Sequence, residues 1–516
     1  MTTGSSSRSR RRVVVMAWVA SAAVFLQVVT VTVGGSTAQS KARDRSRAKR
    51  KTRSGGTGFA IVTTTTAPTA SATAQAGGAG LGDVLFPTDG NSGYDVVDYD
   101  LSVRLDDVPA GMIHGVARIR LVPHALHDAD KAGALSAFHL DLHSLIVDRV
   151  TVGGDPAGFS RVDDELIVTP RRPLLDGVEQ TVVVTYAGQP ETIADGGSPI
   201  GLGWQPADGP KATYVLSEPN GAKNWFPAND HPLDKATFTF RLDVPVPYQA
   251  LANGTLVSSS NTASRSMSVW RMNQPMATYL ATVHVGAFER VQHFGARVPV
   301  TDWYLRGASF NRSAFAAQPA MLNWLEGLIG PYPFESYGAV VTDGPRPLAL
   351  ETQSLSTFFT HATSEAAVVH ELSHQWFGDS VSVARWDDVW LNEGFATYLE
   401  RMWRERSIGP AAFEDNMRTA YDAVRSGASG PVRVLTRDEL FGRSTYLRGA
   451  LVLHALRRNY GDAVFENVLR AYYVKFAGRN ATSEDFFAVV GEVAGSAALG
   501  TVRHWAVDPV VPPYGS

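Results

Sequence analysis

The sequence contains no cysteine. Disulfide bonds, thiolate metal ligands and a cysteine nucleophile are therefore excluded, and the redox environment of the protein stays undetermined. The chain also has no internal repeat. With 516 residues, of which 44% are hydrophobic and 10% aromatic, it has enough material for two or three globular domains with sizeable cores.

Positive charge is scarce outside the first 53 residues. Residues 1–53 hold 12 of the 47 Lys and Arg side chains and only one acidic residue, Asp44. This leaves 35 of the 47 basic and 49 of the 50 acidic side chains for the other residues, a formal charge of −14. An acidic body argues against a nucleic-acid partner. The basic run from Lys41 to Arg53 is predicted to be a solvated, disordered arm.

The first forty residues are typical of an export segment. Four arginines, the last of them Arg12, precede a largely apolar run from Val13 to Val33. Small residues at Ser36 and Ala38 resemble a signal-peptidase site. The run is also long enough to span a bilayer, although the basic residues behind it favour the cytoplasmic side. We expect an exported protein, secreted or tethered at the outer face of the cell envelope, with membrane attachment through Val13–Val33 if this run is retained.

Residues 54–80 lack the bulky side chains that a core requires. The stretch "TTTTAPTASATAQAGGAG" is rich in Gly, Ala and Thr and shows no hydrophobic periodicity. Such a composition is typical of a flexible linker. We therefore expect residues 1–53 to form an export signal or membrane anchor with a basic arm, and residues 54–80 to connect them to the globular part.

Residues 81–300 show the alternation of β-strands. From Val97 to Leu105, apolar residues occupy every second position, with polar residues between them. The segments "FHLDLHSL" and "QTVVVTYAG" continue in the same manner, separated by Gly, Pro and Asp clusters. This half is predicted to be a mostly β, sandwich-like domain.

From residue 301 onward the periodicity becomes helical. The stretch "SAFAAQPAMLNWLEGLIG" has helical spacing and stops at Gly330, directly before Pro331. Further helices are expected at Ser364–Gly378, Leu391–Arg406, Tyr446–Asn459 and Ser483–Glu492. Residues 301–516 are thus predicted to form an α-rich domain with a few strands, and the fold class is a multidomain α+β protein.

One of these helices contains the pentapeptide HELSH, which begins at His370. On a helix, His370 and His374 lie on one face, one turn apart, where two imidazole nitrogens can bind one ion. Glu371 lies one position further round and can face the open side of the ion without binding it. Glu393, in "WLNEGFATYLE", offers a third ligand from a second helix. Two histidines, one carboxylate and a free position for water make up the hydrolytic zinc set.

Two other interpretations of this stretch compete with the hydrolytic one. The two helices can be amphipathic, solvated elements that carry His and Glu by chance. A closed structural zinc site would need a fourth protein ligand, which the local sequence does not offer. Lone histidines elsewhere are interpreted as structural, namely His284, His361, His454 and His504.

HELSH, eighteen intervening residues and then Glu393 within WLNEGFA resemble the signature of the gluzincin aminopeptidases of family M1, the aminopeptidase N and leukotriene hydrolase type. The likeness continues in "SEPNGAKNWFPANDHPLDKATFTFRLDVP", "MATYLATVHVGAFE", "YPFESYG" and "TYLRGALVLHALR", in the family order, and extends over residues 94–508. It implies an N-terminal β-saddle domain followed by a thermolysin-like, mainly helical catalytic domain. The chain resembles the short members that lack a large C-terminal helical domain.

The resemblance implies a role for each matching residue. His370, His374 and Glu393 would bind one Zn²⁺ per chain. Glu371 would be the general base, which takes a proton from a zinc-activated water and passes it to the departing amine. Tyr446, in a block that usually reads Y-x-K-G, would hydrogen-bond the oxyanion of the tetrahedral intermediate.

Further acidic residues would determine the kind of peptidase. Glu351, in "PLALETQS", and Glu218, in "LSEPNGA", match family carboxylates that bind the free α-ammonium group of the substrate. A charge-assisted pair at a fixed distance from zinc admits one residue before the scissile bond. Glu400, seven residues after Glu393, would return to the same helix face, where it either orients a ligand histidine or is simply solvated.

Four positions depart from the family pattern. Leu348 stands where the G-x-M-E-N motif has its glycine, and Thr352 replaces its asparagine. Ala228 replaces a common cysteine, and Arg448 replaces the usual lysine while keeping its charge. None of the four is a zinc ligand or the base. We therefore expect activity to be retained and specificity to be altered, chiefly through Leu348 and Thr352.

The leading hypothesis is a zinc aminopeptidase that acts outside the cytoplasm on peptides with a free N-terminus. One alternative is a thermolysin-like zinc endopeptidase, which shares the zinc set but has no use for Glu218 and Glu351. Another is a non-catalytic peptide-binding module, and a more distant one is epoxide hydrolysis. The preferred N-terminal residue, the physiological substrate and the oligomeric state do not follow from the sequence.

Overall fold

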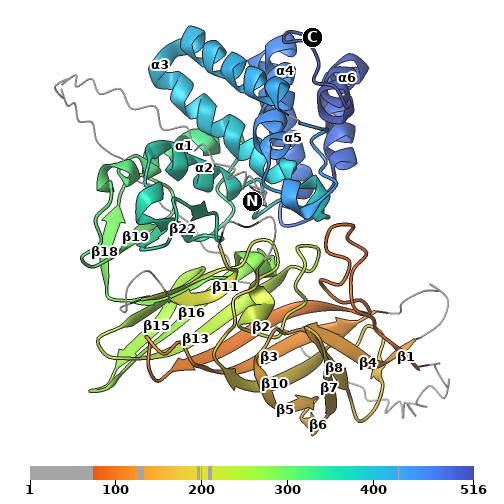
Figure 1. Ribbon diagram of the computed structural model, residues 1–516, viewed down its shortest axis with the longest axis vertical. Coiled ribbons are helices and arrows are strands. Elements are labelled where there is room, and N and C mark those ends of the chain that lie inside the picture. The colour runs from red at the N-terminus through yellow and green to blue at the C-terminus, as the bar shows by residue number, and fades with distance from the viewer. Residues whose placement is uncertain (1–73, 125–132, 195–197, 199, 207–211, 428) are drawn as a thin grey trace, which may run out of the picture. The chain divides into compact units, whose positions relative to one another are not determined.

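The computed structural model describes residues 74–124, 133–194, 198, 200–206, 212–427 and 429–516. The predicted apolar run Val13–Val33, the basic arm and most of the predicted linker lie outside the described residues. Figure 1 shows strands in the orange-to-green part of the chain and long helices in the blue part. The β-then-α order predicted from periodicity is therefore present.

The largest sheet has eight strands in the order β15-β16-β13-β2-β3-β10-β5-β6. In chain order these strands are β2 (Tyr94–Leu105), β3 (Ile113–Pro123), β5 (Ile146–Val152), β6 (Asp155–Pro156), β10 (Gln180–Gly188), β13 (Ala236–Pro245), β15 (Thr255–Asn261) and β16 (Arg265–Met276). All neighbouring pairs are antiparallel except β13 with β2.

Strand β2 shows why the alternation in the sequence forms a sheet with one buried face. Tyr99, Leu101 and Val103 are 0–1% exposed, whereas the residues between them are partly exposed. The alternation breaks at its start, because the register with β3 shifts between Val96 and Asp98. As a result Val96 is buried and Val97, which the pattern placed inside, is partly exposed.

Two smaller sheets complete the N-terminal half. One has the order β1-β4-β8-β7, with β9 on β4, and the other has the order β11-β12-β17-β14. Their strands are β1 (Ala74–Ala76), β4 (Ala134–Asp141), β7 (Gly158–Val162), β8 (Glu165–Thr169), β9 (Leu174–Leu175), β11 (Gly203–Pro206), β12 (Thr213–Leu216), β14 (Gln249–Ala252) and β17 (Val283–Gly286).

The ordered β-structure begins earlier than the predicted linker end at residue 80. Strand β1 pairs in parallel with β4, and Gly77 N–H donates to the carbonyl of Ala137. A Cβ atom on Gly77 would lie 2.5 Å from the carbonyl oxygen of Ser92. This segment is poor in bulky residues because its backbone packs closely against its neighbours, so its composition resembles that of a linker.

The second half is built on a five-stranded sheet in the order β18-β19-β20-β22-β21. Its strands are β18 (Phe288–His293), β19 (Val300–Leu305), β20 (Ala339–Thr342), β21 (Ala349–Leu350) and β22 (Ser356–Phe359). Strand β18 pairs with β19, so this sheet starts before the boundary predicted at residues 300 and 301. Period-two alternation identifies a strand but not the sheet that it joins, which is why the boundary was misplaced.

Six α-helices and a short parallel pair of strands complete this half within the described residues. They are α1 (Gln318–Leu328), α2 (Glu365–His374), β23 (Ser382–Val383), α3 (Trp390–Ser426), α4 (Gly449–Tyr460), α5 (Asp462–Phe476), β24 (Asn480–Ala481) and α6 (Ser483–Val507). Helix α3 continues beyond its predicted end across a break at Gly409, whose φ is 79°. Helix α5 was not predicted.

Several short helical turns connect these elements. They are η1 (Ala222–Asn224), η2 (Thr278–Leu280), η3 (Arg312–Phe315), η4 (Thr360–Ala362), η5 (Trp386–Asp388), η6 (Arg437–Glu439) and the π-helical turn η7 (Ser444–Arg448). By length and composition, α6 passes as a membrane-spanning helix, but it is broken at Gly495 and its first half packs into the core through Phe486 and Phe487.

A buried carboxylate, that of Asp83, joins the β half to the helical half. One of its oxygens accepts from the backbone N–H groups of Leu85 and Phe86. The other accepts from the N–H of Trp386 at 2.8 Å and lies 3.3 Å from Nε2 of His231. Burial opposes ionisation, but the hydrogen bonds from His231 and the three N–H groups lower the pKa of Asp83 to about 2.

We expect Asp83→Asn to lower the free energy of unfolding at neutral pH by about 2 kcal/mol, because it weakens charge-assisted hydrogen bonds. The folded-state pKa lies below the unfolded value, so the contribution is complete above about pH 4 and is lost as the pH falls toward 2. Denaturant unfolding of both proteins at several pH values measures this. An equally large difference at the lowest pH would contradict it.

Candidate active site

Helix α2 is fixed by a cap at its start and by apolar side chains on one face, and it presents its two histidines on another face. Ser364 caps its start, accepting a hydrogen bond from Ala367 N–H at 3.0 Å. Val368 and Leu372 are fully buried and anchor the helix in the core. His370 and His374 share the opposite face, and their ring centroids lie 4.8 Å apart.

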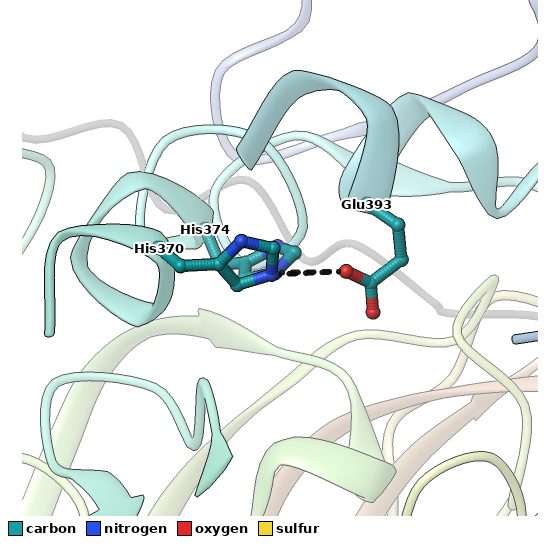
Figure 2. A group of neighbouring side chains, drawn as sticks. All are labelled: His370, His374 and Glu393. Carbon is teal, nitrogen blue, oxygen red and sulfur yellow. Dashed lines mark hydrogen bonds and ion pairs between the residues drawn. The ribbon is translucent and has the colours of Figure 1, made fainter. Parts of the chain in front are cut away.

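Helix α3 brings the carboxylate of Glu393 to this pair of rings. Nε2 of His370 lies 3.2 Å from Oε2 of Glu393, and Nε2 of His374 lies 3.3 Å from the same oxygen. Figure 2 shows both imidazole rings turned toward this carboxylate. Donor atoms about 2.0–2.1 Å from a tetrahedral zinc ion are about 3.3 Å from one another. The three side chains therefore fit a zinc ion in both chemistry and spacing.

The protonation equilibria of these residues show how strongly the cluster attracts positive charge. Burial alone would raise the pKa of Glu393, but the charge of His374 and hydrogen bonds from both histidines hold it below its ordinary value. Burial would lower the pKa of His370, yet its hydrogen bonds to Glu393 and Glu400 raise it well above 6.5. A cation is favoured at this point in the fold.

The other ring nitrogen of each histidine, Nδ1, also has a contact that orients the ring. Nδ1 of His370 lies 3.4 Å from Oε2 of Glu400, seven residues after Glu393 on the same face of α3. Nδ1 of His374 donates to the carbonyl of Phe377 at 3.2 Å. These contacts leave the Nε2 atoms of both rings directed at Glu393 and fix the ring orientations. Of the two predicted settings for Glu400, the structure shows the one beside a histidine.

Glu371 and Glu351 lie in the same cluster. One carboxylate oxygen from each and a ring nitrogen of His374 all lie within 4.8 Å of one another. The two glutamates are 6% and 2% exposed. Burial raises the pKa of Glu371 to about 8, against the opposing charges of His370 and His374. A carboxyl group that titrates near neutrality is able both to accept and to release a proton.

Glu218 approaches the cluster from the β half, two residues after β12. Its side chain is 8% exposed, and Oε1 has no hydrogen-bond partner among the described residues. The same holds for Oε1 of Glu351. Burial and the negative charges of Glu351 and Glu393 raise the pKa of Glu218 well above its ordinary value. The cluster thus holds two buried, incompletely satisfied carboxylates, and that of Glu351 lies beside His374.

Tyr446 belongs to η7, a π-helical turn at the start of α4. Its ring stacks on His370 with centroids 6.3 Å apart. Burial and the charge of Glu393 raise the pKa of Tyr446, so its hydroxyl stays a donor at neutral pH. Helices α3 and α4 touch here at two glycines. A Cβ on Gly394 would lie 2.8 Å from Cα of Gly449, and only residues without side chains permit this approach.

The positions that depart from the family pattern have local structural roles. Thr352 bonds to Thr357 and to the carbonyl of Leu355, and Leu348 is partly buried against the core. Ala228 is fully buried, and its backbone pairs with Asp141. Arg448 does not contact the site. Its guanidinium binds the backbone carbonyls of three other residues, Gly430, Trp505 and Asp508.

The four lone histidines lie outside the cluster of metal-binding side chains. His284 bonds to Thr282 and Thr357, and His504 to Asp508. His454 lies between Tyr398 and Tyr514, and His361 is exposed in the short helical turn η4.

The sequence analysis missed three features of the site. Asp379, five residues after His374, is fully buried and neither of its carboxylate oxygens has a partner among the described residues. Gln375 is also fully buried and binds the segment that carries Glu351. The close contact of Gly394 with Gly449 was missed as well. Glycine directly after Glu393, and again three residues after Tyr446, was the available signal for that contact.

Comparison with known proteins identifies the family. The description "Peptidase family M1 domain" matches residues 328–505, and "Peptidase M1 N-terminal domain" matches residues 207–280. A crystal structure of an M1 zinc metallopeptidase from Deinococcus radiodurans is 33% identical, with a TM-score of 0.77, covering 85% of this chain and 99% of that one. The chain belongs to peptidase family M1. The family and the fold class predicted from the sequence are thereby confirmed, and this membership implies zinc as the metal of the site.

Among curated proteins, this M1 chain is 28% identical to Aminopeptidase M1-A of Oryza sativa subsp. japonica over 68% of its own length and 43% of the relative. It is 26% identical to Probable aminopeptidase 1 of Sulfurisphaera tokodaii, over 72% of its own length and 49% of the relative. The chain therefore spans less than half of these curated relatives. A mutant of the Deinococcus enzyme bound to a Tyr-Ser-Ala substrate matches with a TM-score of 0.79 at 33% identity, over 85% of this chain and 99% of that one.

We expect Glu400→Ala to lower zinc affinity about tenfold or more, because Nδ1 of His370 loses the carboxylate that orients the ring. Competition with a chromophoric chelator measures the affinity. Asp415→Ala, which removes an exposed acid from the same helix, is the matched control and should leave it unchanged. Equal zinc affinity in both variants would show that Glu400 is only a solvated residue.

Proposed function

We propose that this M1 protein is a zinc aminopeptidase, with one zinc ion per chain, that removes single residues from the free N-terminus of peptides. The observation that carries the proposal is the pair of buried carboxylates Glu218 and Glu351, each with an unsatisfied oxygen. The Glu351 carboxylate lies beside His374, and its charge acts on Glu218. A substrate α-ammonium group would satisfy both. It would also neutralise charge that is costly to leave buried.

The position of this pair supports an exopeptidase. The Glu351 carboxylate lies within 4.8 Å of a ring nitrogen of His374, a ligand in the proposed zinc set. An ammonium group held at that carboxylate leaves room for one residue before the bond that faces the metal. Longer N-terminal extensions would have to displace the charge-assisted contact, so cleavage one residue from the N-terminus is favoured.

The chain's own residues would divide the chemistry among them. His370, His374 and Glu393 would hold zinc, which supplies a Lewis acid that polarises the scissile carbonyl and acidifies water. Glu371 would accept the proton of the attacking water and deliver it to the departing amine. The Tyr446 hydroxyl would donate a hydrogen bond to the carbonyl oxygen as negative charge develops on it.

Related proteins support the same activity. The curated relatives cited above are named as aminopeptidases. Two further matching structures, each 33% identical, are described as a two-domain M1 zinc metallopeptidase mutant bound to L-tryptophan and to L-arginine. Free amino acids are the products that an aminopeptidase releases. A thermolysin-like endopeptidase would not need Glu218 and Glu351, and a binding module would not need Glu371 beside the histidines.

We expect the protein to hydrolyse aminoacyl-coumarin amides with a free amino group and to leave their N-acetylated counterparts intact. Glu371→Gln should reduce kcat about a thousandfold, because the proton acceptor is lost while the zinc ligands stay in place. Fluorescence release over a panel of amino acids measures both effects. Equal hydrolysis of acetylated substrates would favour the endopeptidase, and a zinc-loaded protein without turnover would favour the binding module.

We also propose that the protein is exported, either secreted or attached to the membrane through Val13–Val33. The arginines before this run and the small residues at Ser36 and Ala38 support the proposal. N-terminal sequencing of the protein from medium, membrane and cytoplasmic fractions tests it. We expect either a start directly after Ala38 outside the cell or an intact N-terminus in the membrane. A full-length cytoplasmic protein would contradict export.

A further inference from the structure

The side chain of Gln375 links the zinc helix to the segment that carries Glu351. Gln375 follows His374 at the end of α2 and is fully buried. Its Nε2 donates to the carbonyl oxygen of Glu351 at 2.9 Å, and its Oε1 accepts from the N–H of Ser354 at 2.7 Å. Both ends of one amide thus bind the same four-residue segment, as a neighbouring strand would bind it.

The segment from Glu351 to Ser354 has no regular structure to hold it in place. It leaves β21 at Leu350 and rejoins the sheet at Ser356, the first residue of β22. Ser354 has a φ of 64°, a left-handed conformation that residues with a side chain rarely adopt. A backbone of this kind keeps one conformation only when its surroundings fix it.

The β half fixes the far end of this segment. Nδ2 of Asn253 donates to the carbonyl of Gln353 at 2.8 Å, and Gly254 N–H donates to Oγ of Ser354 at 2.7 Å. Neither contact reaches Glu351. Gln375 alone, among these side chains, contacts the backbone of the residue that carries the carboxylate.

We propose that Gln375 is a positioning residue that sets the distance between the amine-binding carboxylate of Glu351 and the metal site. The inference rests on the proposed aminopeptidase function. The linkage is short. His374, a metal ligand in the proposed set, directly precedes Gln375 in the chain, and the Gln375 side-chain amide hydrogen-bonds the backbone carbonyl of Glu351. The Glu351 carboxylate lies within 4.8 Å of a ring nitrogen of His374, and in this proposal the linkage keeps the segment at that distance.

Local contacts distinguish this role from general packing. The Oε1 atom of Gln375 also accepts from the Tyr332 hydroxyl at 3.3 Å, so its amide is satisfied at both ends. Gln318 provides the contrast, because it is equally buried and neither end of its amide has a partner among the described residues. Replacing Gln318 removes a buried amide without removing this linkage, so its effect can be compared with that of replacing Gln375.

The test is amine discrimination by the full-length, zinc-loaded protein. Isothermal titration gives the Kd of L-tryptophan and of N-acetyl-L-tryptophan, which differ in the ammonium group. We expect Gln375→Met to weaken L-tryptophan binding about tenfold, because Glu351 is no longer held, and to leave N-acetyl-L-tryptophan binding unchanged. Zinc affinity should not change, because the hydrogen bonds described for the Gln375 side chain go to Glu351, Ser354 and Tyr332 and not to a zinc-binding side chain.

Two further variants make the experiment decisive. Gln318→Met should keep the discrimination of the wild type. Gln375→Asn keeps a buried amide but is one methylene too short to bridge the segment, so it should lose discrimination even if Gln375→Met fails to fold. Wild-type discrimination that persists in Gln375→Asn would overturn the linkage and leave the aminopeptidase intact. A wild type that does not discriminate would overturn the proposed function and this inference with it.

Discussion

The site buries more negative charge than its own residues neutralise, and most of its features follow from this imbalance. Glu218, Glu351, Glu371, Glu393 and Asp379 are each at most 8% exposed, and burial favours protonation of every one of them. The two histidines offset part of this charge and hold Glu393 ionised. What remains is an excess of negative charge, which a metal ion and, in the proposed function, the α-ammonium group of a substrate would offset. In the proposed function, this excess of buried negative charge would favour both the metal ion and the N-terminal end of a peptide.

Three elements far apart in the sequence have to meet for this excess of negative charge to form. Helix α2 supplies the histidines, α3 supplies Glu393 and Glu400, and the β half supplies Glu218 two residues after β12. Asp83 contributes to the junction of the two halves, since its carboxylate binds Trp386 four residues before α3 begins. The β domain is thus part of the site, and it both contributes a carboxylate and fixes the start of the helix that carries another.

Local patterns in the sequence were enough to predict α2, Glu393 and the order of the two halves. The spacing of HELSH places both imidazoles on one helix face whatever surrounds it, which is why this prediction needed no tertiary information. The β18 boundary, helix α5 and the fixed β1 segment were not predictable in this way, because sheet membership and close backbone packing depend on distant partners. Gln375 could not be recognised either. Its partners are more than twenty residues away, and a glutamine carries no pattern that indicates what it binds.

The contact between Gly394 and Gly449 limits how this protein can be engineered. Replacing a helical glycine by alanine is a standard route to a more stable helix, with a gain of about 1 kcal/mol per site. Here both glycines adjoin active-site groups: Glu393 directly precedes one, and Tyr446 lies three positions before the other. A methyl group at either position would push α3 and α4 apart and move the Tyr446 hydroxyl away from the metal site. At this helix crossing the clash would cancel the usual gain in stability and disturb the site as well, so an engineering effort would have to leave both glycines unchanged.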